Sequence, residues 1–243
     1  ATGKTPSHLW IDSKSATVYA SMQDSDELVA IDLATQTLKW RSRTGSLPAD
    51  VFGTPDDKLL LVAEAFDFRS AMSDQEYYLR AVGGMQSGRF GQRGRDYSAG
   101  MRVYDISYPA RPRAIGFLET EGLGIHRIWW VGDRYAYASA LLDGYSDYIL
   151  IVIDLADPAR PVMVGRWWLP GMWLAGGEQA VHAPGRAGLH HAVVADDVAY
   201  GCWRDGGVTL IDVKDKTAPK LIAHRTWSPP FDGGTHSALP LHD

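Results

Sequence analysis

A short apolar strand that ends in a hydrophobic-Asp-hydrophobic triplet recurs four times along the chain. The four copies are Leu28–Leu33, Met101–Ile106, Leu150–Leu155 and Val208–Val213. Closely related proline-containing turns follow three of them, at residues 107–112, 156–161 and 214–219. Proline blocks continuation of a strand and fixes the bend, so each copy predicts a strand, a turn and another strand. This repetition constrains the fold more than any other feature, because each unit must pack against its neighbours.

A second pattern precedes these strands and consists of a strand, a tight turn and another strand. Its copies are Gly188–Tyr200, Gly124–Tyr137 and, more loosely, Pro6–Ser21, and residues 233–241 begin a further one. Together the two patterns make units of four short antiparallel strands every ~45 to 50 residues, which is typical of a β-propeller blade. We therefore predict one all-β domain over residues 1–243. Its predicted blades lie at about residues 7–45, 48–120, 124–170 and 188–228, with an incomplete fifth at 233–243.

The fifth unit contains only its inner strand. An orphan strand exposes unpaired backbone edges, and most propellers close their ring with complete blades. We therefore expect the chain to be part of a larger ring, or a second chain or subunit to complete the propeller.

Composition excludes some classes of partner. A chain of 243 residues that is 45% hydrophobic can bury a sizeable core. Its net charge of −5 argues against a nucleic-acid partner, and it has no apolar run near the ~20 residues of a membrane span. Cys202 is the single cysteine and predicts no internal disulfide. The chain starts with Ala1 rather than methionine, which is compatible with export and cleavage, so we favour an exported location.

The Asp-terminated strands and the turn Asp157–Pro161 resemble the LVIVD-repeat family of β-propeller proteins. The first unit, with Val18–Ala20 and Ala30–Leu33, is similar to the related YVTN type. The resemblance covers nearly the whole chain outside two insertions, at residues 67–99 and 170–188. It implies the propeller fold, but these families are mostly bacterial, often exported and varied in activity, so it implies no single function.

Histidine returns at one position in several units. His126, His190 and His236 stand at the same offset before the buried run of an inner strand. Inner strands start at one face of the disc, here called the top face, and converge around the central channel, so the three side chains are expected to meet there. Neutral imidazoles bind transition metals, and we predict that the three hold iron, copper, manganese or zinc. The alternative for each histidine is a hydrogen-bonded residue at a strand start.

A neighbouring position in the same strands is polar in every unit. It is held by His8, Asp50, Arg127 and His191. Alternate residues point to opposite faces of a strand, so these residues do not automatically share the first position. Strand entrances are irregular, however, and His8 or His191 is the predicted fourth ligand. Arg127 is expected to contact the substrate.

The predicted histidine cluster is similar in geometry and residue type to two kinds of known site. One is the four-histidine iron site of the carotenoid cleavage oxygenases, and the other is the histidine-rich site of the selenium-binding protein and methanethiol oxidase family. The chain lacks the longer motifs of both families. The similarity therefore implies metal binding by imidazoles and leaves the reaction open.

Both insertions are expected at the top face, where long loops are often functional. Their polar and aromatic residues include Tyr78, Arg80, Arg89, Arg93, Trp173, Glu178 and His182. We predict a lid in which Tyr78, Glu178 or His182 transfers a proton. The arginines and Trp173 are the predicted contacts to an anionic or aromatic substrate. The alternative is a flexible surface loop or a subunit interface.

Other repeated residues have structural explanations. The pairs Trp129–Trp130 and Trp167–Trp168 lie in strands, where one ring can pack between blades. The repeated aspartates each precede a turn and are interpreted as turn residues.

Two functions remain after these considerations. The first is a metal-dependent enzyme with its histidine cluster at the top of the channel, acting on a small organic substrate by oxidase, oxygenase or lyase chemistry. The second is a non-catalytic propeller that binds a protein or carbohydrate partner through its top face.

Overall fold

The chain folds into four antiparallel sheets of four strands each, and within every sheet the strands lie side by side in chain order. The structure is a computed structural model and describes residues 5–45, 47–64, 99–130, 132–179, 186–228, 230–231 and 234–241. In these segments helical structure is limited to two short 3-10 turns, η1 (Gln23–Ser25) and η2 (Leu174–Gly176). The predicted all-β propeller fold with four blades is confirmed.

Each blade is one of these sheets. Blade 1 contains β1 (Pro6–Ile11), β2 (Thr17–Met22), β3 (Glu27–Asp32) and β4 (Leu38–Arg43). Blade 2 contains β5 (Asp50–Gly53), β6 (Leu59–Glu64), β7 (Gly100–Asp105) and β8 (Arg113–Glu119). Blade 3 contains β9 (Gly124–Trp130), β10 (Tyr135–Leu141), β11 (Ile149–Asp154) and β12 (Val162–Trp167). Blade 4 contains β13 (His191–Ala195), β14 (Val198–Cys202), β15 (Val208–Asp212) and β16 (Lys220–Arg225).

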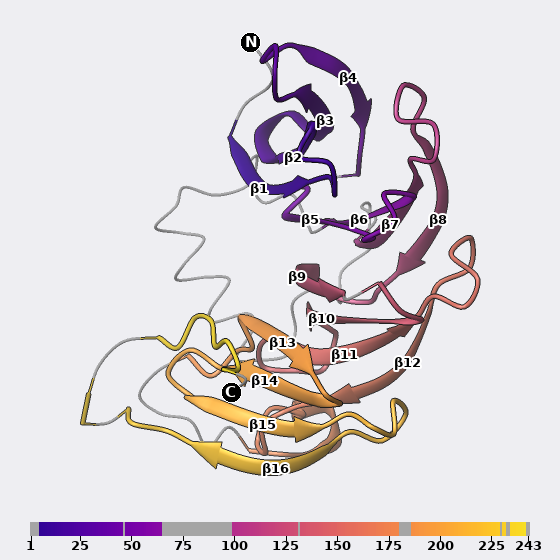
Figure 1. The fold of residues 1–243 in the computed structure, drawn as a ribbon. Helices are drawn as coiled ribbons and strands as arrows, with labels where there is room; N and C mark the ends of the chain where they lie inside the picture. Colours follow the sequence, from indigo (N-terminus) through magenta and orange to yellow (C-terminus); the bar gives the residue numbers. More distant parts are fainter. Residues whose placement is uncertain are drawn as a thin grey trace.

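The blades follow one another in an arc, with the first strand of each on its inner side (Figure 1). Neighbouring inner strands are in contact, β1 with β5, β5 with β9 and β9 with β13. The middle strands are buried on both faces because blades stack on either side of them, and Ile149–Ile153 is a continuous buried run. The last strand of a blade faces solvent, and every residue of β16 is exposed. The core therefore lies between the sheets, and the inner strands are left to line the channel.

The repeated aspartates form turns, as their position in the sequence predicts. Asp32, Asp105, Asp154 and Asp212 each accept a hydrogen bond from the backbone N–H two residues later, at 2.8 to 3.1 Å. These bonds stabilise the bend between the third and fourth strands of every blade.

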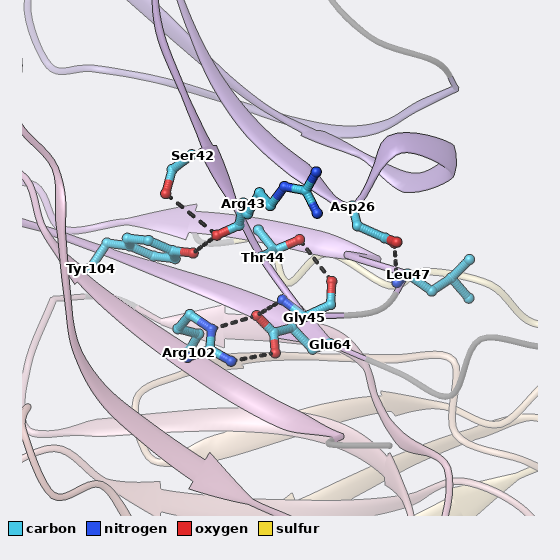
Figure 2. A network of polar contacts seen from close by, with 9 residues as sticks. All are labelled: Asp26, Ser42, Arg43, Thr44, Gly45, Leu47, Glu64, Arg102 and Tyr104. Atoms are coloured by element: carbon cyan, nitrogen blue, oxygen red, sulfur yellow. Dashed lines mark hydrogen bonds and ion pairs between the residues drawn. The ribbon is translucent and has the colours of Figure 1, made fainter. Parts of the chain in front are cut away.

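A buried polar network joins blades 1 and 2 (Figure 2). The Glu64 carboxylate accepts bonds from Arg102 Nε at 2.7 Å, from Arg102 Nη2 at 3.1 Å and from the Gly45 backbone N–H at 2.8 Å. Tyr104 donates its hydroxyl to the Arg43 carbonyl at 3.1 Å. The charged pair lies within blade 2, and the bonds to Gly45 and Arg43 connect it with the end of blade 1.

The parts of the chain outside the four sheets carry several of the predicted features. The first insertion, predicted at residues 67–99, lies almost wholly outside the described residues, and so does part of the second. The predicted start of a fifth blade corresponds to residues 234–241, where Thr235 forms a single antiparallel bridge with Arg204. Along the described segments, no helix is long and apolar enough to cross a membrane.

Candidate functional site at the channel mouth

The structure brings the three predicted metal-binding histidines together. His126 lies on β9, His190 directly precedes β13, and His236 lies in the segment after blade 4. The ring centroids of His126 and His190 are 5.1 Å apart, and those of His190 and His236 are 3.6 Å apart. We call the region formed by these rings, His8, Arg127 and His191 the channel mouth.

Burial keeps the imidazoles of the channel mouth neutral. The pKa of His190 is lowered to about 3, first by desolvation and then by the charge of Arg127. The pKa of His126 lies well below its usual value, first because of burial and then because of Arg127. The His190 Nδ1–H donates to the His236 carbonyl at 2.9 Å, so its neutral form carries a lone pair on Nε2.

His8 and His191 flank this group and have environments of the same kind. The pKa of His8 is lowered to about 4, first by burial and then by Arg127, while a hydrogen bond to the Ala49 carbonyl acts in the opposite direction. Burial also lowers the pKa of His191, which donates to the Ile128 carbonyl and packs edge-on against Trp129 at 5.9 Å. The buried His191 Nε2 has no hydrogen-bond partner among the described residues.

Arg127 is the charge that these histidines share. Its positive charge lowers the pKa of all five histidines of the channel mouth. The guanidinium is half-buried, and its Nη1 donates to the carbonyls of His126 at 2.9 Å and Ala49 at 3.3 Å. Arg204 adds a second positive charge and lowers the pKa of His126, His190 and His236. Positive charge is therefore concentrated at one point of a chain whose net charge is −5.

One buried carboxylate lies close to this charge. Asp50, at the start of β5, accepts bonds from the Ile128 and Val51 backbone N–H groups, each at 2.9 Å. Desolvation raises the pKa of Asp50 to about 6, while those bonds and Arg127 oppose the shift. Asp50 therefore takes up a proton at a higher pH than an exposed aspartate does.

A third arginine, Arg186, lies in the segment that leads to His190. Arg186 forms a bidentate ion pair with the nearly buried Asp147, at 2.6 and 2.9 Å. A side chain at Gly188 would collide with the Asp147 carboxylate, so glycine is required there. Sequence reasoning did not identify Arg186, Arg204 or Asp147 as site residues. Arg204 and Asp147 flank the loops after β14 and before β11, which the blade topology places at the top face.

The three central histidines fit a shared metal ion only in part. Rings that share an ion direct their in-plane lone pairs to a common point, and the 5.1 Å edge-on arrangement of His126 and His190 is compatible with this. His190 and His236 instead stack with an interplanar angle of 33°, and the Nδ1–H of His190 is bonded to the His236 carbonyl. Among the described residues, no group of three or more His, Cys, Asp or Glu side chains is arranged to hold a metal ion. The shared metal therefore stays a prediction.

The described lid residues form their own compact turn. Glu178 accepts bonds from the Gly171 N–H at 2.8 Å, the Trp173 N–H at 3.0 Å and the Trp168 indole at 3.2 Å. Desolvation acts to raise the pKa of Glu178, but these bonds lower it overall. Trp173 is 38% exposed and packs edge-on against Trp168. The Glu178 carboxylate thus holds the loop together by accepting these hydrogen bonds. Its role in proton transfer stays a prediction.

Five other predicted site residues lie outside the described segments. They are Tyr78, Arg80, Arg89, Arg93 and His182. Their proposed roles in the lid stay predictions.

The comparisons with known proteins concern the fold. A profile of the YNCE-like beta-propeller family matches residues 1–74. No curated protein matches the chain in sequence.

Three solved structures resemble the chain. The Cps50 (Swd1) β-propeller domain of Myceliophteria thermophila has a TM-score of 0.61 at 13% identity, and the match covers 98% of this chain and 59% of that one. A Lactobacillus plantarum structural-genomics protein has a TM-score of 0.60 at 13% identity, with coverages of 95% and 58%. The dihydro-heme d1 dehydrogenase NirN in complex with DHE has a TM-score of 0.53 at 12% identity, with coverages of 90% and 36%.

At such identities these likenesses show the fold alone. The chain spans less than two thirds of each of the three proteins. The LVIVD-repeat resemblance is not tested by these matches and stays a prediction. The four blades and the similar structures together show that the chain is a β-propeller, and its residues 1–74 are similar to the YNCE-like propellers.

Proposed function

We propose that the channel mouth binds a small organic anion. The observation that carries this proposal is the position of Arg127, whose charge acts on all five surrounding histidines. A half-buried guanidinium is weakly screened, and both of the hydrogen bonds described for it use Nη1. A planar guanidinium is also suited to carboxylate and phosphate groups.

The histidines support the same proposal in a second way. Burial and Arg127 keep them neutral, so they add no further positive charge, and the Nδ1–H of His190 is already bonded to the His236 carbonyl. A bound anion would raise their pKa values and recover part of the electrostatic cost of placing Arg127 and Arg204 near one another.

Isothermal titration calorimetry with benzoate, succinate and phosphate at low salt tests the proposal. We expect at least one probe to bind, and Arg127→Gln to weaken that binding by about tenfold or more. Arg160→Gln is the matched control, because Arg160 forms an exposed ion pair with Asp157 in an outer turn. Absence of binding to the wild-type chain, or equal binding to a folded Arg127→Gln variant, contradicts the proposal.

A metal-dependent reaction at the same mouth is the second candidate. It is favoured by the His190 Nδ1–H bond to a backbone carbonyl, which is the arrangement that orients metal-binding imidazoles. His126 and His190, with His8, His191 or His236, would be the ligands. An oxidase, oxygenase or lyase reaction on the bound organic anion is the corresponding activity, with Glu178, His182 or Tyr78 as the proposed proton-transfer group.

Elemental analysis of protein purified without a metal-affinity tag tests this candidate. We expect about one iron, copper, manganese or zinc ion per chain, lost in both His126→Ala and His190→Ala. His224→Ala is the control, because His224 lies on the outer strand β16. If the chain holds no more metal than background after incubation with each ion, the metal-dependent enzyme is ruled out. The non-catalytic scaffold that binds a protein or carbohydrate partner then takes its place.

A further inference from the structure

A row of aromatic rings lies directly below the channel mouth. Trp10, Phe52 and Trp129 occupy the same position on β1, β5 and β9, two residues after His8, Asp50 and Arg127 respectively. The ring centroids of Trp10 and Phe52 are 4.5 Å apart, and those of Phe52 and Trp129 are 5.7 Å apart. Side chains two residues apart point to the same face of a strand, so this row shares its face of the inner strands with His8, Asp50 and Arg127.

The row is held rigidly by its neighbours. The Trp129 indole N–H donates to the Val194 carbonyl of β13 at 3.0 Å. The Trp10 ring lies against Gly53, where any side chain would collide with it. The rings therefore keep their orientation without a ligand, and binding costs little ordering.

The exposure of these rings differs from that of a tryptophan used only for packing. Trp203 is fully buried and donates its indole N–H to Thr209 within the core. Trp10, Phe52 and Trp129 also pack against the core, but all three residues are only half-buried and so retain some exposure.

We infer that the ligand of the channel mouth is a planar aromatic carboxylate. Its carboxylate lies at Arg127, and its ring extends into the channel along Trp10, Phe52 and Trp129. Arg127 selects for the negative charge of the ligand. The aromatic row selects for a flat ring, because contacts between aromatic rings are more favourable than burial alone. This inference rests on the proposed anion binding and names the chemical class of the anion.

The test compares two acids with the same carbon skeleton. In calorimetry at pH 7 and low salt, 2-naphthoate is expected to bind about tenfold more tightly than decahydro-2-naphthoate, which lacks aromaticity. The neutral 2-naphthamide is expected to bind more weakly than 2-naphthoate, because it lacks the charge. Trp129→Leu should remove the preference for the aromatic acid, and Trp129→Phe should keep most of it. Trp227→Leu is the control, since Trp227 is a partly exposed tryptophan after β16.

The outcomes separate this inference from the proposed function. Equal binding of the two acids to the wild-type chain, or binding of small anions but of neither acid, overturns the aromatic class and leaves anion binding intact. Failure of every anion to bind overturns both. If circular dichroism shows that Trp129→Leu loses its fold, the comparison of the two acids on the wild-type chain still decides the inference.

Discussion

Glu64 is a fully buried carboxylate whose three hydrogen-bond donors come from two blades. Breaking a buried pair leaves the remaining charge without compensation. Glu64→Gln should therefore lower the free energy of unfolding by about 3 kcal/mol, measured by urea denaturation. The control is Arg160→Gln, whose exposed ion pair should change stability by less than about 0.5 kcal/mol. Similar losses in the two variants would show that burial of Glu64 carries no special energetic weight.

Asp50 should give the chain a stability that falls as pH rises. Its folded pKa of about 6 lies above the unfolded value of 3.8, mainly because of desolvation, so the folded state binds the proton more tightly. Below pH 3.8 this tighter binding of the proton makes its full contribution to the stability of the folded state, and the contribution is lost as pH rises through 6. Asp50→Asn should thus gain stability relative to wild type by up to about 3 kcal/mol between pH 4 and pH 7.

Urea denaturation of both proteins at several pH values measures this difference. The absolute stability of Asp50→Asn also includes its altered bonds to Ile128 and Val51, so only the change with pH bears on the ionisation. A difference between the proteins that stays constant over this range would contradict the assigned pKa.

At the scale of elements, the outer strands determine how closely blades stack. Each outer strand has a bulge at an equivalent place, and the residue next to it is Trp40 in β4, Gly116 in β8, Gly165 in β12 and Ala223 in β16. A side chain at Gly116 or Gly165 would collide with a backbone carbonyl in the third-to-fourth-strand turn of the following blade. Glycine at these two positions is therefore a packing requirement, whereas Ala223 is exposed.

Gly165→Ala should consequently destabilise the chain by about 2 kcal/mol, because the turn at Lys216 must move to admit the methyl group. Chemical denaturation of the full chain provides the measurement. Ala223→Val is the matched control at the equivalent position of blade 4, and it should alter stability by less than about 0.5 kcal/mol. An equal effect at both positions would argue against stacking between blades as the cause.

At the scale of the whole molecule, charge is distributed unevenly. The chain carries −5 overall, yet Arg127 and Arg204 act together at the channel mouth. An anion is therefore repelled at long range and attracted at short range, and salt screens both effects. For 2-naphthoate we expect binding to weaken on the order of fivefold between about 0.05 and 0.5 M NaCl, because the short-range contact dominates affinity. The neutral 2-naphthamide is the control, and an equal salt dependence for it would indicate that charge does not hold the acid.

The sequence by itself determined the fold class and the strand positions of the residues that form the candidate site. Strand periodicity, the Asp-terminated triplets and the proline turns are local features, and local geometry suffices to build a blade. The equivalent offsets of His126 and His190 also placed them at the start of their inner strands, because the strand period is regular.

Only the tertiary structure decided how these side chains meet. The stacking of His236 on His190, the ion pair of Arg186 with Asp147, and the row from Trp10 to Trp129 all depend on distances between blades. Those distances follow from bulges and close glycine contacts, and the directions of long side chains follow from the space left between the sheets. A repeat pattern along the chain encodes neither quantity, which is why the histidines could be aligned from sequence while their charged and aromatic surroundings could not.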